Sequence, residues 1–434
     1  MAAATRLLNA GRVAMVSTRR SARGPSATAT AIGTEKDKKP KADGKRKRSA
    51  STAAAKSTPA AASAPAANTD DATPLLDLGP LEEGVLVCRP SQRNRSPYVG
   101  DVRLTSGPNA GRVAVTHLPN MDSGGKCRPG VRVLCRRQPG VTPDTVGQYG
   151  TPKCELVCQL IRCDEPENDA LGGCWVSAHP TIGEKLVEAL IRRGALDARL
   201  HAPVLNLETQ VGKTRKVSAS ASGGYRPDFR ATHADGTATL LETKQVVDTD
   251  YDPRTVHDAA ALQPGHPVYA PKDVASIGYE RAGIFPWGKR GQKGPGGEAV
   301  VSARAIEHVR ELSAVVDESG SKRGKRGTGD VHENRTGDVH AAVVLMAGRH
   351  DVCAIRANGA ACPSFAAHLA SAERGGVRVL GHRVRWGEGV DVGRAFDGGE
   401  VPVLPPLTEE DLAVMIPKPG KEKKPAPKKA RTDE

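Results

Sequence analysis

The stretch RPDFRATHADGTATLLETKQVV, residues 226–247, decides how this chain folds around a set of charged side chains. Ala234-Asp235-Gly236 has the composition of a hairpin turn, and the residues on either side of it predict two antiparallel strands. Side chains at positions i and i+2 of a strand share a face, so we expect Glu242 and Lys244 to point the same way. Asp228, fourteen residues before Glu242, is expected to approach them from the neighbouring strand.

Two carboxylates and one ammonium that converge on a sheet are typical of PD-(D/E)XK phosphodiesterases. Asp228 and Glu242 would offer oxygen ligands to Mg²⁺, and Lys244 would orient a water molecule. The alternative is a surface ion pair with no role in chemistry, because Glu-x-Lys recurs at Glu422 and Lys424 in a solvated tail. However, two leucines precede the motif and two valines follow it, which indicates a buried strand where unpaired charge is costly.

The positive charge of the chain lies almost wholly at its ends. The net charge is +14, of which residues 1–74 carry +9 and residues 416–434 carry +4. One internal segment, residues 81–140, has ten Arg and Lys against four Asp and Glu, a net +6. A basic segment beside a neutral, acid-containing one suits polyanion binding next to metal chemistry, although a soluble surface would give the same charge.

Nine cysteines, seven of them between Cys88 and Cys174, lack the CxxC spacing of a zinc site. Most lie in apolar runs, so we expect reduced thiols in an intracellular compartment. No apolar run approaches the ~20 residues of a membrane span, so we expect no membrane association.

Two overlapping address signals occupy the first 74 residues. Five arginines precede the first acidic residue, Glu35, and resemble an organellar transit peptide. The run Lys45-Arg46-Lys47-Arg48 resembles a nuclear localisation signal, and the C-terminal tail repeats the theme. We expect a nuclear location, with mitochondrion or plastid as the alternative. The composition predicts disorder.

Residues 81–140 contain four short apolar runs separated by turn residues, which predict a small β-barrel. Residues 181–195 predict a helix with a capping box at Thr181 and Glu184, with Glu184 on the solvated face. A second helix is expected from Ser302, followed by a strand, a helix beginning at Pro363 and another strand, which together make an α/β domain.

The order of motifs resembles the sugar fermentation stimulation protein (SfsA) family, over about residues 81–385. The matching motifs, in chain order, are VLVCRPSQRNRSPYVGDVRL, His117-Leu118-Pro119-Asn120, Pro129-Gly130, Trp175-Val176, Glu208 ahead of Gly212, Arg226-x-Asp228-Phe229, Glu242-x-Lys244, Phe285-Pro286, Arg304 with His308, and Arg349-x-Asp351. Departures from the family pattern occur at Met121-Asp122, Trp287 and Cys362-Pro363, and they put substrate contacts near Trp287 in doubt.

The resemblance implies an α/β (α+β overall) fold, an OB-like barrel followed by a PD-(D/E)XK nuclease-like domain, with Mg²⁺ or Mn²⁺ as the cofactor. The expected divisions are a disordered basic tail at 1–79, the barrel at 80–165, the nuclease-like domain at 166–395 with insertions at 248–300 and 317–340, and a disordered basic tail at 396–434.

The implied function is DNA binding with metal-dependent phosphodiester hydrolysis, RNA being the alternative partner. Glu208 is a further candidate metal carboxylate. The candidate nucleic-acid contacts are Arg93, Arg95, His117, Asn120, Arg226, Arg304 and His308. For Arg226, Arg304 and His308, the alternative is helix-surface solvation and ordinary ion pairing. Two rival functions stay open: a non-catalytic DNA-binding regulator on a retired nuclease fold, and an RNA- or chromatin-associated protein that binds through its tails.

Overall fold

The structure is a computed structural model. It describes residues 73–120, 126–163, 173–209, 225–249, 281–288, 290–325 and 338–406, without the side chains of 320–325. Most of both predicted basic tails, together with Gly212 and Met121-Asp122, lie outside the described residues.

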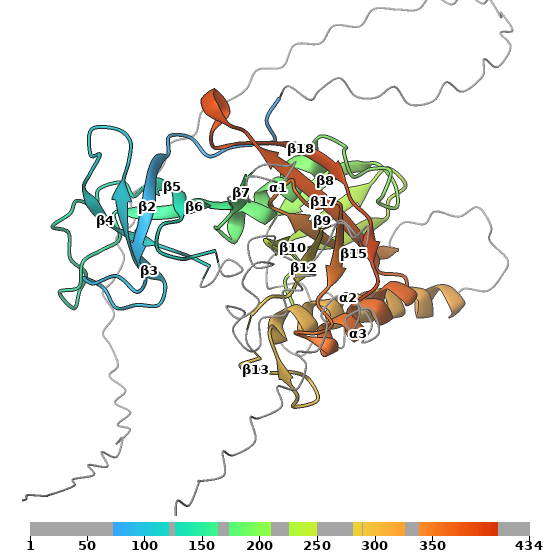
Figure 1. The fold of residues 1–434 in the computed structure, drawn as a ribbon. Helices are drawn as coiled ribbons and strands as arrows, with labels where there is room; N and C mark the ends of the chain where they lie inside the picture. Colours follow the sequence, from blue (N-terminus) through green and yellow to red (C-terminus); the bar gives the residue numbers. More distant parts are fainter. Residues whose placement is uncertain are drawn as a thin grey trace, which may run out of the picture. The chain divides into compact units, whose positions relative to one another are not determined.

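The first part of the fold is a five-stranded barrel (Figure 1). Its strands are β2 (Glu82–Cys88), β3 (Val99–Leu104), β4 (Val113–His117), β5 (Arg132–Arg137) and β6 (Leu156–Cys163). They pair antiparallel in the order β4-β3-β2-β5-β6, and a parallel pairing of β6 with β4 closes the barrel. Alternating apolar residues fill its interior, among them Leu86, Val102 and Cys135. The predicted barrel strands are therefore confirmed.

The second part is a seven-stranded mixed sheet of order β1-β18-β17-β15-β10-β9-β8. Its strands are β1 (Leu76–Asp77), β8 (Val204–Thr209), β9 (Phe229–His233), β10 (Ala238–Val246), β15 (Val339–Ala347), β17 (Arg378–Trp386) and β18 (Arg394–Glu400). One face packs against α1 (Thr181–Arg192); the other packs against α2 (Ala303–Lys325) and α3 (Pro363–Arg374) (Figure 1). β10 and β15 are buried on both faces. The near-continuous apolar sequence of β15 is typical of such a strand, whereas β10 carries Glu242 and Lys244 into the interior.

Short strands complete the described structure. β7 (Cys174–Ser177) extends the barrel sheet from β6. A four-stranded sheet joins β11 (Asp248–Thr249), β12 (Ala282–Phe285), β16 (Ala354–Ala357) and β19 (Val403–Leu404), and a two-stranded ribbon joins β13 (Gln292–Lys293) and β14 (Ala299–Val300). A 3-10 turn spans Gly389–Asp391.

The predicted hairpin is confirmed. β9 and β10 pair antiparallel, and the turn between them places Gly236 at φ +80°, a left-handed conformation that favours glycine. β10 then pairs in parallel with β15 over its whole length, so the hairpin's second strand becomes a central strand of the sheet.

Two predictions about the helices were wrong. Thr181 caps nothing, because Pro180 takes the N-cap position, and the Thr181 hydroxyl lies 2.8 Å from Nδ1 of His179. The second helix, expected over residues 302–316, continues to Lys325.

Three of the expected divisions contain strands of the described structure. β1 lies inside the expected tail 1–79, and β18 and β19 run past residue 395 into the expected C-terminal tail. The expected insertion 248–300 contains buried β11 and β12. These strands are short or rich in glycine and charge, so partner strands hold them in place rather than propensity of their own.

All nine cysteines are free in the structure. Within the described residues, no helix combines the length and apolarity needed to cross a membrane.

Candidate metal and phosphodiester site

Glu242 and Lys244 lie in the middle of β10 and are 2% and 9% exposed. On the same face of the strand, Leu240 and Val246 belong to the apolar layer beneath α2 and α3. The expected buried, charged strand is therefore present, and the surface ion-pair alternative for this Glu-x-Lys pair is excluded.

Asp228 lies directly before β9, at the register position opposite Glu242. The pairing Leu241 with Phe229 sets this register, and one further step along both strands brings the two carboxylates face to face. Oδ2 of Asp228 accepts a hydrogen bond from the backbone N–H of Thr243 at 2.7 Å. Directly opposed residues share a face, so Asp228, Glu242 and Lys244 converge as the sequence predicts.

Both oxygens of Glu242 have donors. Nζ of Lys244 donates to Oε1 at 2.5 Å, and Nδ1 of His308 also contacts Oε1. The hydroxyl of Tyr225 donates to Oε2 at 3.1 Å. Burial raises the pKa of Glu242, but the hydrogen bond from His308 and the charge of Lys244 outweigh it and hold that pKa below its usual value. Glu242 is therefore anionic at neutral pH.

Asp228 behaves in the opposite way. Burial, followed by the negative charge of Glu242, raises the pKa of Asp228 to about 7, and the N–H of Thr243 opposes the shift. Glu184 on α1 adds to the rise, although the sequence placed this glutamate on a solvated face. Two carboxylates held this close together repel each other when both are ionised, and a bound cation would relieve that repulsion.

Tyr225 is a residue that the sequence reasoning missed. Burial and the charge of Glu242 raise the pKa of its hydroxyl well above the usual value, so it acts as a donor. Its ring lies edge-on to His308 with centroids 5.2 Å apart. The sequence signal that could have identified it is its position three residues before Asp228, from which its side chain can reach Glu242 on β10.

His308 projects from α2 into the site and is 8% exposed. Nε of the exposed Arg304 donates to its Nε2 at 3.2 Å, and its Nδ1 contacts Glu242. The structure thus places His308 as a support of a carboxylate, where the sequence predicted a phosphate contact. Arg304, one turn earlier, connects this buried chain of hydrogen bonds to the surface.

Glu208 and Arg226 lie at the edge of the site. Glu208 on β8 faces Arg230 of β9 and pairs with it at 3.3 Å, with its side chain 43% exposed. Glu208 is therefore held by Arg230. The structure does not bring its carboxylate together with those of Asp228 and Glu242. Arg226 is exposed, two residues before Asp228.

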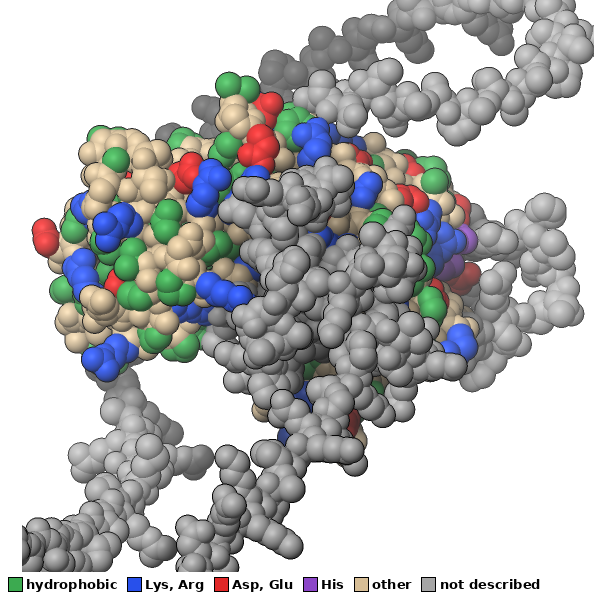
Figure 2. All heavy atoms as spheres, in the orientation of Figure 1, with side chains coloured by type: hydrophobic (Ala, Val, Ile, Leu, Met, Phe, Trp, Pro, Cys, Tyr) green, Lys and Arg blue, Asp and Glu red, His purple; other side chains and the backbone are tan. Residues whose placement is uncertain are grey.

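The barrel candidates make contacts within the barrel. Arg93 is exposed and donates to the carbonyl of Pro143 at 3.1 Å. The carbonyl of Asn120 accepts from Arg89 at 3.2 Å. Arg95 is exposed, and His117 is half-buried at the end of β4. On the face drawn in Figure 2, Lys and Arg side chains lie scattered over the barrel rather than joined in one area.

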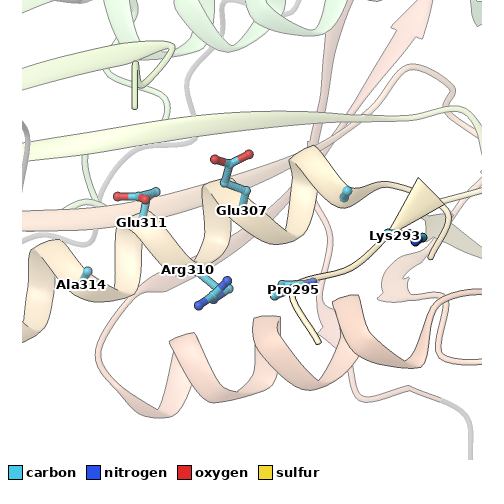
Figure 3. Close-up of a pocket in the computed structure, with 7 residues that line it drawn as sticks. Lys293, Pro295, Glu307, Arg310, Glu311 and Ala314 are labelled. Atoms are coloured by element: carbon cyan, nitrogen blue, oxygen red, sulfur yellow. The ribbon is translucent and has the colours of Figure 1, made fainter. Parts of the chain in front are cut away.

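A cavity of about 480 Å³ lies between α2 and the segment of β13 and β14 (Figure 3). It is lined by Lys293, Pro295, Ala303, Glu307, Arg310, Glu311 and Ala314. Figure 3 shows Glu307 and Glu311 on one side of the helix and Arg310 on the other. Burial and then Glu307 raise the pKa of Glu311. None of the three predicted catalytic residues lines this cavity, and its mixed charges do not select one class of ligand.

The donor chemistry fits a hard divalent cation. Asp228 and Glu242 offer carboxylate oxygens, which Mg²⁺ and Mn²⁺ prefer. In the described ranges, no group of three or more His, Cys, Asp or Glu side chains could enclose a metal ion. A cation here would therefore depend on two carboxylates, with water and substrate phosphate as its remaining ligands, which is the usual manner for Mg²⁺.

No model of a known protein family matches the chain. It is 29% identical over 181 residues to a sugar fermentation stimulation protein homolog from Parasynechococcus marenigrum, which covers 41% of this chain and 60% of the relative. It is 25% identical over 310 residues to a homolog of the same name from Prochlorococcus marinus, covering 71% of this chain and 89% of the relative. The chain thus spans less than two thirds of the Parasynechococcus relative.

A solved structure, that of Pyrococcus furiosus SfsA in complex with Ca²⁺, resembles the chain with a TM-score of 0.46 and 16% identity. The match covers 77% of this chain and all of that one.

Proposed function

The chain belongs to the sugar fermentation stimulation protein family, and from that premise we propose that it binds DNA and hydrolyses phosphodiester bonds with the help of a divalent cation. The observation that carries the proposal is the pair of opposed carboxylates, Asp228 and Glu242, with the ammonium of Lys244 on the same buried face.

The arrangement of elements supports the proposal. The barrel has the strand order of an OB-fold, in which the third and fifth strands close the barrel in parallel. An antiparallel hairpin whose second strand joins a parallel partner, as β9, β10 and β15 do, is the framework expected of a PD-(D/E)XK nuclease domain.

Each polar residue of the site has a separate task in this reaction. Asp228 and Glu242 would hold the cation, which when bound supplies charge neutralisation of the phosphate and a more acidic water. Lys244 would orient the attacking water and stabilise negative charge that builds on the phosphoryl oxygens. Tyr225 and His308 grip Glu242 from two sides, so its carboxylate stays ionised and fixed in orientation.

DNA is the proposed partner, with Mg²⁺ or Mn²⁺ as the cofactor, and the nucleus is the proposed location because of the basic runs in the tails. The tails carry +13 of the +14 net charge and would supply non-specific attraction to the phosphate backbone. Removing them should therefore lower non-specific affinity and flatten its salt dependence. An unchanged salt slope would show that the tails do not contact the polyanion.

One observation favours a second candidate, a DNA-binding regulator on a retired nuclease fold. Both oxygens of Glu242 already have donors, from Lys244, His308 and Tyr225. If these contacts persist in the presence of a cation, Glu242 is a poorer ligand than in an active nuclease.

Cleavage of supercoiled plasmid and of single-stranded DNA, with Mg²⁺ or Mn²⁺ against EDTA, separates the two candidates. The full chain should nick or degrade DNA only with the cation. Asp228→Ala and Lys244→Ala should abolish cleavage, whereas DNA binding in EDTA should persist. If the full chain binds DNA but cleaves it under none of the metal conditions, the second candidate, a DNA-binding regulator, is supported instead.

A further inference from the structure

Barrel arginines differ in whether a carboxylate neutralises them. Arg132 pairs with Glu83 at 2.7 Å, and Arg137 pairs with Glu82 at 2.5 Å. Arg136, between them on β5, is exposed and has no hydrogen-bond or ion-pair partner among the described residues.

Strand register places Arg136 beside a second unpaired basic group. Arg136 of β5 and His117 of β4 both lie opposite Val157 of β6, one on each side of it, and opposed residues share a face. His117 is half-buried, and within the described part of the chain no hydrogen bond to its ring is found.

The chain passes from β7 to α1 alongside β6, where His179 comes level with Cys158, the residue after Val157. The backbone N–H of Ala178 donates to the carbonyl of Gln159 at 2.8 Å, which continues the β6–β7 pairing and brings His179 alongside. Nδ1 of His179 lies 2.8 Å from the Thr181 hydroxyl; its Nε2 has no partner in the described residues. Lys185, exposed on the first turns of α1, is also unpaired within that part of the chain.

The mutual influence of these groups agrees with the geometry. Burial, and then the positive charges of Arg136, His117 and Lys185, lower the pKa of His179. The charges that act on His179 are thus all of one sign, as in a surface built for an anion.

This surface is connected to β10 through Gln245, on the face of the strand that packs against α1. The side-chain amide of Gln245 donates to the carbonyls of His179 and Pro180 at 3.0 and 2.9 Å, the orientation that satisfies both of its ends. Gln245 directly follows Lys244 on β10. The segment that carries His179 is therefore held by the strand that carries the catalytic candidates.

We propose that His117, Arg136, His179 and Lys185 form a phosphate-binding surface, the joint patch, that receives the backbone of duplex DNA on the α1 side of the strand that carries Glu242 and Lys244. The inference rests on the proposed function and adds where the substrate is held. Two arginines predicted as contacts, Arg93 and Arg95, lie in the β2–β3 loop and are not part of the patch.

Equilibrium binding of a labelled duplex of about 20 base pairs in EDTA tests the patch without cleavage. The full-length double variant Arg136→Ala/Lys185→Ala should bind at least about tenfold more weakly at ~0.1 M salt, and its log K against log salt slope should fall by about 1.8. The matched control is Arg103→Ala/Arg374→Ala, which removes the same charge from two exposed positions. Arg103 lies at the opposite end of the β3–β4 pairing from His117.

A selective loss in the patch variant, with an unchanged melting temperature, supports the joint patch even if the wild type cleaves nothing, because the assay measures binding alone. Equal losses of affinity in both double variants would show that only the total charge matters, and would overturn the patch. In that case, plasmid cleavage by the wild type would still support the proposed function. Loss of binding to single strands or RNA but not to duplex would overturn the assignment to duplex DNA.

Discussion

Replacing Asp228 by an asparagine should remove a pH dependence of stability that the carboxylate pair imposes on the metal-free protein. The pKa of Asp228 is raised from 3.8 to about 7 by burial and by Glu242. A carboxyl whose pKa is raised on folding contributes stability that is fully present below its unfolded pKa and is lost as the pH rises through the folded pKa. The wild type in EDTA should therefore become less stable between about pH 4 and pH 7.

The size of the effect follows from the two pKa values. Linkage with 3.8 in the unfolded chain and about 7 in the folded protein gives a loss of roughly 4 kcal/mol across that window. Asp228 is partly accessible to solvent, so this is an upper figure. The side-chain amide of the Asp228→Asn variant keeps an oxygen to accept the Thr243 N–H but cannot ionise, so the variant's curve should lack this loss.

Urea unfolding followed by circular dichroism at several pH values measures the difference. Asp317→Asn, an exposed position on α2, controls for the change in net charge. Adding Mg²⁺ near pH 8 should stabilise the wild type, by about 2.7 kcal/mol at one hundred times its dissociation constant, and should not stabilise Asp228→Asn. Parallel pH curves for wild type and Asp228→Asn, or equal stabilisation by Mg²⁺, would refute the shared-site reasoning.

Three further outcomes are expected. Asp351→Asn should lower the free energy of unfolding by about 3–5 kcal/mol in urea melts, because buried Asp351 accepts two hydrogen bonds of 2.5 Å from the buried guanidinium of Arg349. A decrease below about 1 kcal/mol would contradict this. Tyr225→Phe should cost about 1.5 kcal/mol by removing a hydrogen bond to ionised Glu242, and an unchanged melting curve would count against that bond. Burial and the neighbouring His201 lower the pKa of His340, so the stability that neutral His340 contributes should be present above pH ~6.5 and lost as the pH falls. His340→Gln should therefore reduce the loss of unfolding free energy on acidification, and an unaltered loss in this variant would argue against this role.

The central charged constellation was predictable because its geometry is local. Strand periodicity places Glu242 and Lys244 on one face, and a tight turn with Gly236 at positive φ returns the chain so that Asp228 meets them. The barrel strands followed for the same reason, from short apolar runs separated by turns. None of these steps needs a contact between distant segments.

The remaining features depend on packing between segments far apart in sequence, which periodicity does not encode. His308 became a support of Glu242 because α2 crosses the face of β10, and Glu184 came near Asp228 because α1 packs on the other side. β18, whose sequence RAFDGGE is poor in strand formers, and the two-residue β19 form because partner strands satisfy their backbone groups. Sequence alone thus determined which side chains converge within one hairpin, and tertiary packing decided which groups surround them, because the free energy of those contacts arises only when the distant elements are assembled.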